Sequence, residues 1–238
     1  MSQQFPSFRF EPPTPFVKQI LIGATVLYIA EQILMGWMNI PLSQWVAWDP
    51  NGTFTHPWAL LTHFVLLLNS PIGFLFEMIA IYFFLPVIVD SYGRKGLHRL
   101  LLWIAIITSV LGTIGVITGA IPKTSAPAFG LHPILIALVA IFGLKNPFAT
   151  IYVLVFPIQA SWVAWGSGIL ALLNFFAGRS LESLLVIGGW ITGYLFVTGH
   201  GHIKPIKFWR KYSSKVQHKK RHRRLQAMDG GKTDKYEH

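Results

Sequence analysis

Three side chains of this sequence are our candidates for proton-transfer or nucleophilic chemistry. Glu77 lies inside the apolar run Gly73-Phe-Leu-Phe-Glu-Met-Ile-Ala, and His132 directly precedes Pro133. An ionisable group at membrane depth is costly unless it faces a partner or a wet cavity, so we expect Glu77 to point into the protein. Ser125 lies seven residues before His132, but a serine hydroxyl without a general base is a poor nucleophile. One histidine and one carboxylate fall short of the roughly four ligands of a usual metal site, so we predict neither a metal nor another cofactor.

The composition indicates a membrane protein. The 238 residues are 53% hydrophobic and only 12% charged, about half of the roughly 25% usual in soluble domains. No cysteine is present, which excludes disulfides, thiolate metal sites and cysteine nucleophiles. Of the net charge of +11, residues 203–238 carry +9 and residues 1–202 carry +2. We therefore predict two parts, a membrane domain over 1–202 and a basic tail over 203–238.

Six apolar runs approach the roughly 20 residues that a membrane-spanning helix needs. They are 16–38, 70–89, 97–120, 129–144, 161–177 and 183–198. Lys and Arg cluster after the second, fourth and sixth runs, and short cytoplasmic loops carry such an excess. We therefore expect an all-α, multi-pass integral membrane protein with six transmembrane helices and both termini in the cytoplasm. The lack of an organelle-type targeting signal favours a bacterial inner membrane.

Two stretches do not fit a spanning helix. The segment 41–69 is half apolar and rich in Trp, and we expect it to lie in the membrane interface on the outer side. Residues 147–157 form an apolar run between two prolines that is too short to span, so we predict a re-entrant or membrane-surface segment. Several tryptophans near expected helix ends fit interfacial anchoring; they are Trp37, Trp45, Trp48, Trp58 and Trp209.

Two pairs of glycines have the spacing that lets helix backbones approach closely. They are Gly115 with Gly119 and Gly189 with Gly193. We favour packing within the bundle over a dimer contact for both pairs.

The order of these segments resembles that of the rhomboid superfamily of intramembrane serine proteases over about residues 10–200. Four motifs carry the resemblance: Glu11-Pro-Pro-Thr-Pro-Phe-Val-Lys, Trp58-Ala-Leu-Leu-Thr-His-Phe, the stretch 147–162 with Phe156-Pro157, and Gly188-Gly-Trp-Ile-Thr-Gly. In the second motif Ala59 stands where the family has Arg. The resemblance implies a six-helix rhomboid-like bundle with an interfacial outer loop after the first helix and a basic cytoplasmic tail after the last.

The positions that this resemblance assigns to catalysis hold other residues. Gly130-Leu-His-Pro aligns with the family's Gly-x-Ser-Gly, so His132 stands at the nucleophile position, and Val186 stands at the position of the base. Gly73 and Glu77 stand where the family has the His and Asn of its oxyanion hole, and a carboxylate cannot stabilise a developing oxyanion. The resemblance therefore implies a pseudoprotease that is not an enzyme. A protease with rearranged chemistry at Ser125 is the alternative.

The resemblance also brings Glu77 and His132 together. If the rhomboid geometry holds, they replace two groups that faced one substrate carbonyl, so we predict that they pair and fill the former active site. The helix dipole disfavours a cation at the start of the fourth helix, so only the carboxylate would favour an imidazolium at His132. The alternative is that both side chains are solvated separately in a cavity open to the outer loops.

Inactive relatives in this family bind membrane clients that enter between the second and fifth helices. Here that lateral gate would be lined by bulky side chains; they are Ile79, Phe83, Trp162, Trp165 and Leu172. We predict a protein that binds transmembrane segments of other integral membrane proteins without cleaving them. A structural subunit of a larger membrane protein complex is the alternative.

The tail combines an amphipathic pattern with a basic cluster. Ile206, Trp209, Tyr212 and Val216 recur at roughly helical spacing with Lys and Arg between them. We expect anchoring to anionic lipid headgroups; nucleic acid is the weaker alternative, because attraction to phosphate is not selective. The lipid-binding residues that we predict are Lys207, Arg210, Lys211, Lys219, Lys220, Arg221, Arg223 and Arg224.

Overall fold

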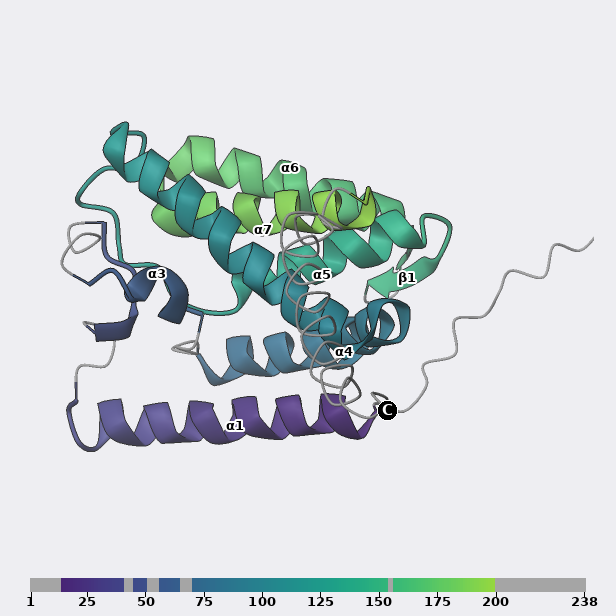
Figure 1. Cartoon of the computed structure of the whole chain (residues 1–238), viewed down its shortest axis with the longest axis horizontal. Helices are drawn as coiled ribbons and strands as arrows, with labels where there is room; N and C mark the ends of the chain where they lie inside the picture. The colour runs from purple at the N-terminus through teal and green to yellow at the C-terminus, as the bar shows by residue number, and fades with distance from the viewer. Residues whose placement is uncertain (1–13, 41–44, 51–55, 65–69, 154–155, 200–238) are drawn as a thin grey trace, which may run out of the picture. The chain divides into compact units, whose positions relative to one another are not determined.

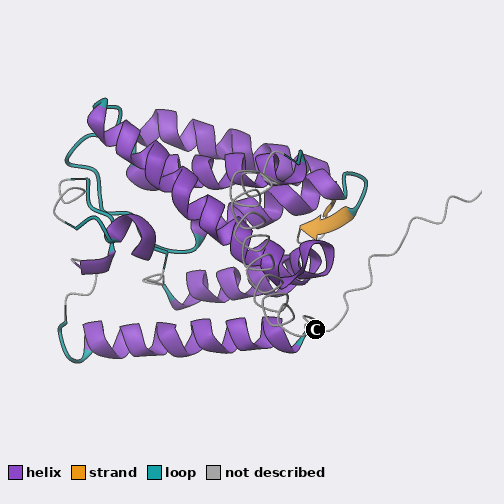
Figure 2. Cartoon of the chain, in the orientation of Figure 1, coloured by secondary structure: helices purple, strands orange, loops and turns teal. Residues whose placement is uncertain are grey.

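The computed structural model describes residues 14–40, 45–50, 56–64, 70–153 and 156–199 of the chain. The chain divides between Gly201 and His202 into two units, and all described residues lie in the first. This part is mostly helical (Figures 1 and 2). The expected tail over 203–238, with all of its predicted lipid-binding residues, lies outside the described residues.

Three helices are long and apolar enough to cross a membrane: α1 (Pro15–Gly36), α4 (Pro71–Ile117) and α6 (Ala160–Gly178). Two shorter apolar helices are α5 (His132–Lys145) and α7 (Leu181–Val197). The short helix α3 (Ala59–Thr62) lies in the segment between α1 and α4. The six apolar runs of the sequence therefore fall on five helices, because α4 covers the second and the third run.

The long helix α4 is divided at Gly93. Its 47 residues would extend about 70 Å if straight, roughly twice the thickness of a bilayer core. Gly93 has φ 69° and ψ 174°, a backbone conformation that glycine adopts without the steric cost of a side chain. At this point the chain turns back, so that the second half of α4 runs in the opposite direction to the first (Figure 1). The loop that the sequence predicts between Val89 and Leu97 is reduced to this single non-helical residue.

Capping residues explain where three helices begin. Thr14 and Ser70 each precede a proline at the first helical position, and their hydroxyls accept hydrogen bonds from Val17 N and Gly73 N. Ser180 accepts from Ser183 N in the same way at the start of α7. Side-chain oxygens at this position satisfy backbone N–H groups that have no partner within the helix, and proline costs little directly after them.

The buried core lies between α4, α5 and α7. It includes Leu100 and Ile104 of α4, Leu138 and Ile141 of α5, and Phe196 of α7. In contrast, most of α1 is exposed, and it contacts α4 at a few points such as the stacked rings of Tyr28 and Phe74. The helices that carry the site residues described below are therefore the best-packed part of the described chain.

Glycines set the close approach of α7 to α5. A methyl group at Gly189 would lie 2.1 Å from the carbonyl oxygen of Pro133, and one at Gly193 would lie 2.7 Å from that of Ala137. This pair therefore packs within the bundle, as the sequence indicates. Gly119 has another role: it has φ +71° in the turn after α4, with nothing within 4 Å of an added methyl group.

The alanine variant Gly189→Ala is expected to lower the free energy of unfolding by about 2 kcal/mol, because a backbone carbonyl cannot move aside as a flexible side chain can. The measurement is reversible unfolding in mixed micelles at rising dodecyl sulfate concentration. Gly23→Ala is the matched control, because an added methyl group there meets no atom within 4 Å. Equal effects of the two substitutions would contradict the close approach.

The segment between α5 and α6 is a β-hairpin, which the prediction of an all-α protein did not include. Strands β1 (Thr150–Val153) and β2 (Phe156–Gln159) pair antiparallel, with Thr150 opposite Gln159 and Val153 opposite Phe156. β-Branched and aromatic residues favour strands, and the pairing satisfies backbone groups that an isolated apolar segment would leave open. The hairpin ends where Ala160 N donates to Ala149 O at 2.8 Å.

Trp48 is not an interfacial anchor, in contrast to the expectation from its position. Its side chain is fully buried, and its ring fills the space over Gly112 of α4, where an added methyl group would lie 2.1 Å from the ring. Its backbone pairs with Ala128 through two hydrogen bonds of 2.9 and 2.8 Å. The exposed tryptophans Trp37, Trp45 and Trp58 stay compatible with an interfacial position.

Candidate functional site

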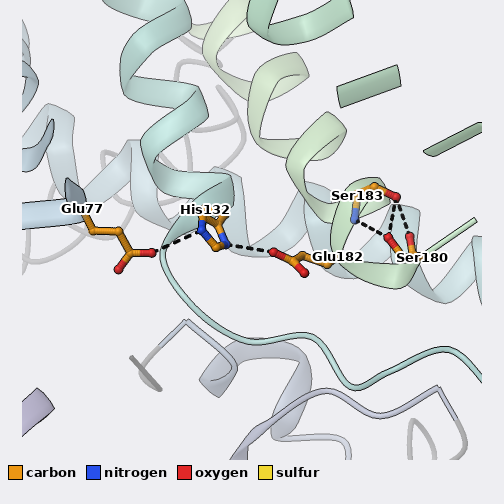
Figure 3. Close-up of polar contacts among 5 residues, drawn as sticks. All are labelled: Glu77, His132, Ser180, Glu182 and Ser183. Carbon is orange, nitrogen blue, oxygen red and sulfur yellow. Dashed lines mark hydrogen bonds and ion pairs between the residues drawn. The ribbon is translucent and has the colours of Figure 1, made fainter. Parts of the chain in front are cut away.

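His132 lies between two carboxylates that come from different helices (Figure 3). Its Nε2 atom is 3.5 Å from Oε1 of Glu77 in α4, and its Nδ1 atom is 2.9 Å from Oε1 of Glu182 in α7. The Glu77 side chain is 4% exposed, whereas those of His132 and Glu182 are 42% and 54% exposed. The structure thus places Glu77 beside His132, as the pairing hypothesis requires, and adds Glu182. We call these three residues the Glu-His-Glu site.

The start of α4 places Glu77. The helix begins after the Ser70 cap, and Glu77 lies about two turns into it. Phe74, Glu77 and Ile81 are all buried, and their spacing puts them on one helix face. The expectation that Glu77 points into the protein is therefore correct.

The loop before α5 places His132 as the first residue of that helix. Gly130 has φ +100°, and its N–H donates to the carbonyl oxygen of His63 at 3.0 Å. Two residues earlier, Ala128 is paired with Trp48. Pro133 follows at the position where helices tolerate proline best, and its backbone lies against Gly189 of α7. These contacts before and after His132 fix the position of its backbone at the start of α5.

The first turn of α7 places Glu182. The hydroxyl of Ser125 accepts a hydrogen bond from Leu181 N at 3.1 Å, and Ser180 caps the helix through Ser183 N at 3.2 Å. A carboxylate in the first turn of a helix interacts favourably with the positive end of the helix dipole. Glu182 therefore stabilises its own helix start while it contacts His132.

The arrangement suits a doubly protonated imidazole. A neutral imidazole has one N–H donor, whereas an imidazolium has two, and here each ring nitrogen faces a carboxylate oxygen. The two carboxylates offset the helix dipole, which disfavours a cation at the first residue of α5. The site can therefore hold a charged bridge that links α4, α5 and α7 at one end of the bundle.

The described serines near this site have structural partners. The hydroxyl of Ser125 contacts the backbone of Leu181, and the hydroxyls of Ser180 and Ser183 lie 2.8 Å from each other (Figure 3). No hydrogen bond joins any of these three described hydroxyls to His132. Ser125 thus holds the start of α7.

Replacing Ser125 with alanine is expected to lower the free energy of unfolding by about 1 kcal/mol, because Leu181 N then loses its acceptor at the start of α7. Thermal unfolding of the purified protein in detergent measures this effect. Ser167→Ala is the control, since the Ser167 hydroxyl bonds within its own helix, to Ala164 O at 2.8 Å. A Ser125→Ala variant as stable as the parent protein would contradict the structural role.

The other two positions that the resemblance assigns to catalysis hold no reactive group. Gly73 lies in the first turn of α4, where its N–H donates to the Ser70 hydroxyl at 3.1 Å. Val186 is half-buried in α7, one helical turn after Glu182. The i, i+4 spacing puts Glu182 and Val186 on the same face of α7. The acid of α7 that reaches His132 therefore comes from one turn before the expected base position.

The predicted gate residues are all exposed apolar side chains on α4 and α6. Ile79 and Phe83 lie on the first half of α4, and Trp162 and Leu172 lie on α6. Helix α5 packs against both of these helices. Trp165 differs from the other four, because its ring packs against those of Trp190 and Tyr194 in α7, with ring centres 5.2 and 6.1 Å away. This residue is thus partly engaged in packing α6 on α7.

The geometry of the Glu-His-Glu site does not suit a metal ion. The two carboxylates approach opposite nitrogens of one ring, so they do not converge on a common point. Within the described ranges, no group of three or more His, Cys, Asp or Glu side chains is placed to hold a metal ion.

Sequence reasoning missed Glu182 and His63. Glu182 directly precedes the last apolar run, so it reads as a residue outside the membrane. The sequence feature that indicates Glu182 is its spacing of four residues from Val186. This spacing puts Glu182 on the same helix face as the expected base position. His63 belongs to the motif that starts at Trp58, and its carbonyl oxygen holds the loop before His132. That contact joins residues 67 positions apart, which no local pattern indicates.

Comparison of the sequence with models of known protein families and with curated proteins gave no match.

Proposed function

We propose that this chain is a rhomboid-like, six-helix integral membrane protein that binds transmembrane segments of partner proteins without cleaving them. The Glu-His-Glu site carries the proposal, because His132 stands where the resemblance expects the nucleophilic serine. Both ring nitrogens of His132 face carboxylate oxygens. A carboxylate beside each nitrogen favours the imidazolium, and an imidazolium cannot accept a proton from a nucleophile, which is what a general base must do.

The remaining positions support an inactive site. Val186 can neither accept nor deliver a proton at the base position. The hydroxyl oxygen of Ser125 accepts a hydrogen bond from the backbone N–H of Leu181, 56 residues further along the chain. A rearranged protease would need this hydroxyl to leave its partner and find a base.

The membrane placement is supported by the apolar helices and by the break at Gly93. If each half of α4 crosses the bilayer once, five helices give six spans. Arg94, Lys95 and Arg99 then lie at the same end as Lys145, and the excess of basic residues puts this end in the cytoplasm together with both termini.

Isolation of a tagged copy from native membranes in mild detergent, followed by mass analysis of the bound proteins, tests the proposal. A varying set of single-span proteins at low occupancy supports client recognition. A fixed set of subunits at constant ratio would overturn it in favour of a structural subunit. Ile22→Ala is the control for substitutions of the gate residues, because Ile22 is 64% exposed and lies on α1, which carries none of them.

A serine-directed fluorophosphonate probe tests the absence of proteolysis separately. We expect no labelling of the chain, and the same background with Ser125→Ala. Labelling that disappears in the Ser125→Ala variant would contradict the pseudoprotease assignment.

A further inference from the structure

The second half of α4 carries two cations followed by an exposed apolar stripe. Lys95 and Arg99 are exposed and one turn apart. The exposed side chains that follow at spacings of three or four residues are Leu102, Ile106, Val110, Ile114 and Ile117. Residues at these spacings lie on one face of a helix. This face therefore presents positive charge at one end and hydrocarbon along the rest.

Lys95 and Arg99 have no side-chain partner among the described residues, unlike their neighbours Arg94 and Lys145. The Arg94 guanidinium lies 4.7 Å from the centre of the Phe16 ring, and the Lys145 ammonium lies 4.7 Å from that of Tyr92. In the part of the chain that the structure describes, the side chains of Lys95 and Arg99 make no hydrogen bond, ion pair or ring contact. Both side chains are exposed and thus available to an external anion.

The whole end of the bundle around Gly93 is positive. Among the described residues it holds five cations and the single carboxylate of Asp90; the cations are Lys18, Arg94, Lys95, Arg99 and Lys145. The opposite end balances Lys123 and Arg179 against Asp49 and Glu182. An anion is therefore attracted to the Gly93 end, where the side chains of Lys95 and Arg99 have no partner among the described residues.

The dimensions fit one leaflet of a bilayer. The twelve residues from Arg99 to Val110 rise about 16 Å along a helix, close to half of the roughly 30 Å hydrocarbon core. A headgroup phosphate at Lys95 and Arg99 would thus place an acyl chain along Leu102, Ile106 and Val110. We propose that this face of α4 binds a phospholipid with an anionic headgroup. The proposal needs the membrane placement of α4, but it is independent of whether the chain cleaves its partners.

Native mass spectrometry of the full chain with phosphatidylglycerol and phosphatidylcholine tests this site. Each basic residue near a membrane surface contributes roughly 1 kcal/mol of attraction to anionic lipid. The double variant Lys95→Gln/Arg99→Gln is therefore expected to weaken phosphatidylglycerol binding about thirtyfold and to leave phosphatidylcholine binding unchanged. Lys123→Gln, which removes a cation from the opposite end, should leave both unchanged.

Two additional measurements distinguish a lipid site on α4 from a bare anion site and from lipid binding by the tail. Leu102→Gln should weaken binding of the long-chain lipid, and excess inorganic phosphate should not displace it, because the acyl chain contributes to binding. Displacement by phosphate would overturn a lipid site in favour of a bare anion site. Loss of binding only when Lys219, Lys220, Arg221, Arg223 and Arg224 are changed to Gln would overturn the proposal, because the tail would then be the lipid-binding segment.

Discussion

Replacing His132 with alanine is expected to lower the free energy of unfolding by about 3 kcal/mol, the low end of the cost of removing one partner of a buried ion pair. The Glu77 carboxylate would stay buried in α4 and lose the ring that faces it at 3.5 Å. The partial exposure of His132 keeps the cost at the low end, since water screens part of the interaction. Reversible unfolding in mixed micelles measures the effect.

A double-mutant cycle identifies the cause of that loss. Glu77→Gln combined with His132→Ala should be more stable than His132→Ala alone by about 1 kcal/mol, because a buried amide costs less than a buried carboxylate. Additive effects of the two substitutions would show that the lost stability comes from packing alone.

Glu182→Gln provides the matched comparison. The contact of Glu182 to His132 is the shorter of the two, but the Glu182 side chain is 54% exposed. Exposed ion pairs contribute little, so this variant should lose less than about 1 kcal/mol. The comparison separates the effect of burial from that of the distance between nitrogen and oxygen. A larger loss of stability for Glu182→Gln than for His132→Ala would contradict the conclusion that burial determines the cost.

Acidification is expected to destabilise the protein through His63. Burial lowers the pKa of His63 from 6.5 to about 4, opposed by the carbonyl oxygens of Ala59 and Leu60. The centre of the imidazole ring lies 5.6 Å from that of Trp48. Nδ1 lies 3.0 Å from Ala59 O, while Nε2 is buried and has no partner among the described residues. A proton on Nε2 would thus have no acceptor there.

The direction follows from proton linkage. Between pH 6.5 and 4 the unfolded chain binds more protons at His63 than the folded chain, so stability is complete above this window and falls as the pH falls through it. The full loss is about 3 kcal/mol, of which about 2 kcal/mol is expected between pH 8 and pH 5.

His63→Phe isolates the contribution of this histidine. The phenyl ring keeps the aromatic contacts with Trp48 and Phe64 but cannot be protonated. Carboxylates titrate alike in both proteins, so the drop in stability from pH 8 to pH 5 should be smaller in the variant by about 2 kcal/mol. Parallel pH profiles of the two proteins would contradict the burial of a neutral imidazole.

The positions of the helices could be predicted from the sequence because each apolar run is continuous and bounded by polar or capping residues. Thr14 and Ser70, each before a proline, mark helix starts that depend on local chemistry alone. The hairpin was missed for the opposite reason. Its short apolar strands have the same composition as a buried helix segment, and only the pairing across the turn distinguishes the two.

The site could be predicted in part. Glu77 was indicated by a charge within an apolar run, and its closeness to His132 was implied by the rhomboid resemblance. Glu182 lies outside any apolar run, and its contact with His132 depends on the close approach of α5 and α7 at Gly189. Trp48 illustrates the same limit. Its burial depends on the absence of a side chain at Gly112, 64 residues away.

Photo-crosslinking from the gate tests the central proposal most directly. A photoreactive amino acid at Phe83 or at Trp162, both exposed, should capture single-span membrane proteins at their full length in native membranes. The same amino acid at Ile22 on α1 should capture few of them. Full-length partners captured at the gate positions are the predicted result. Partners captured equally at Ile22, or found cut within their transmembrane segments, would contradict a protein that binds such segments at this surface without cleaving them.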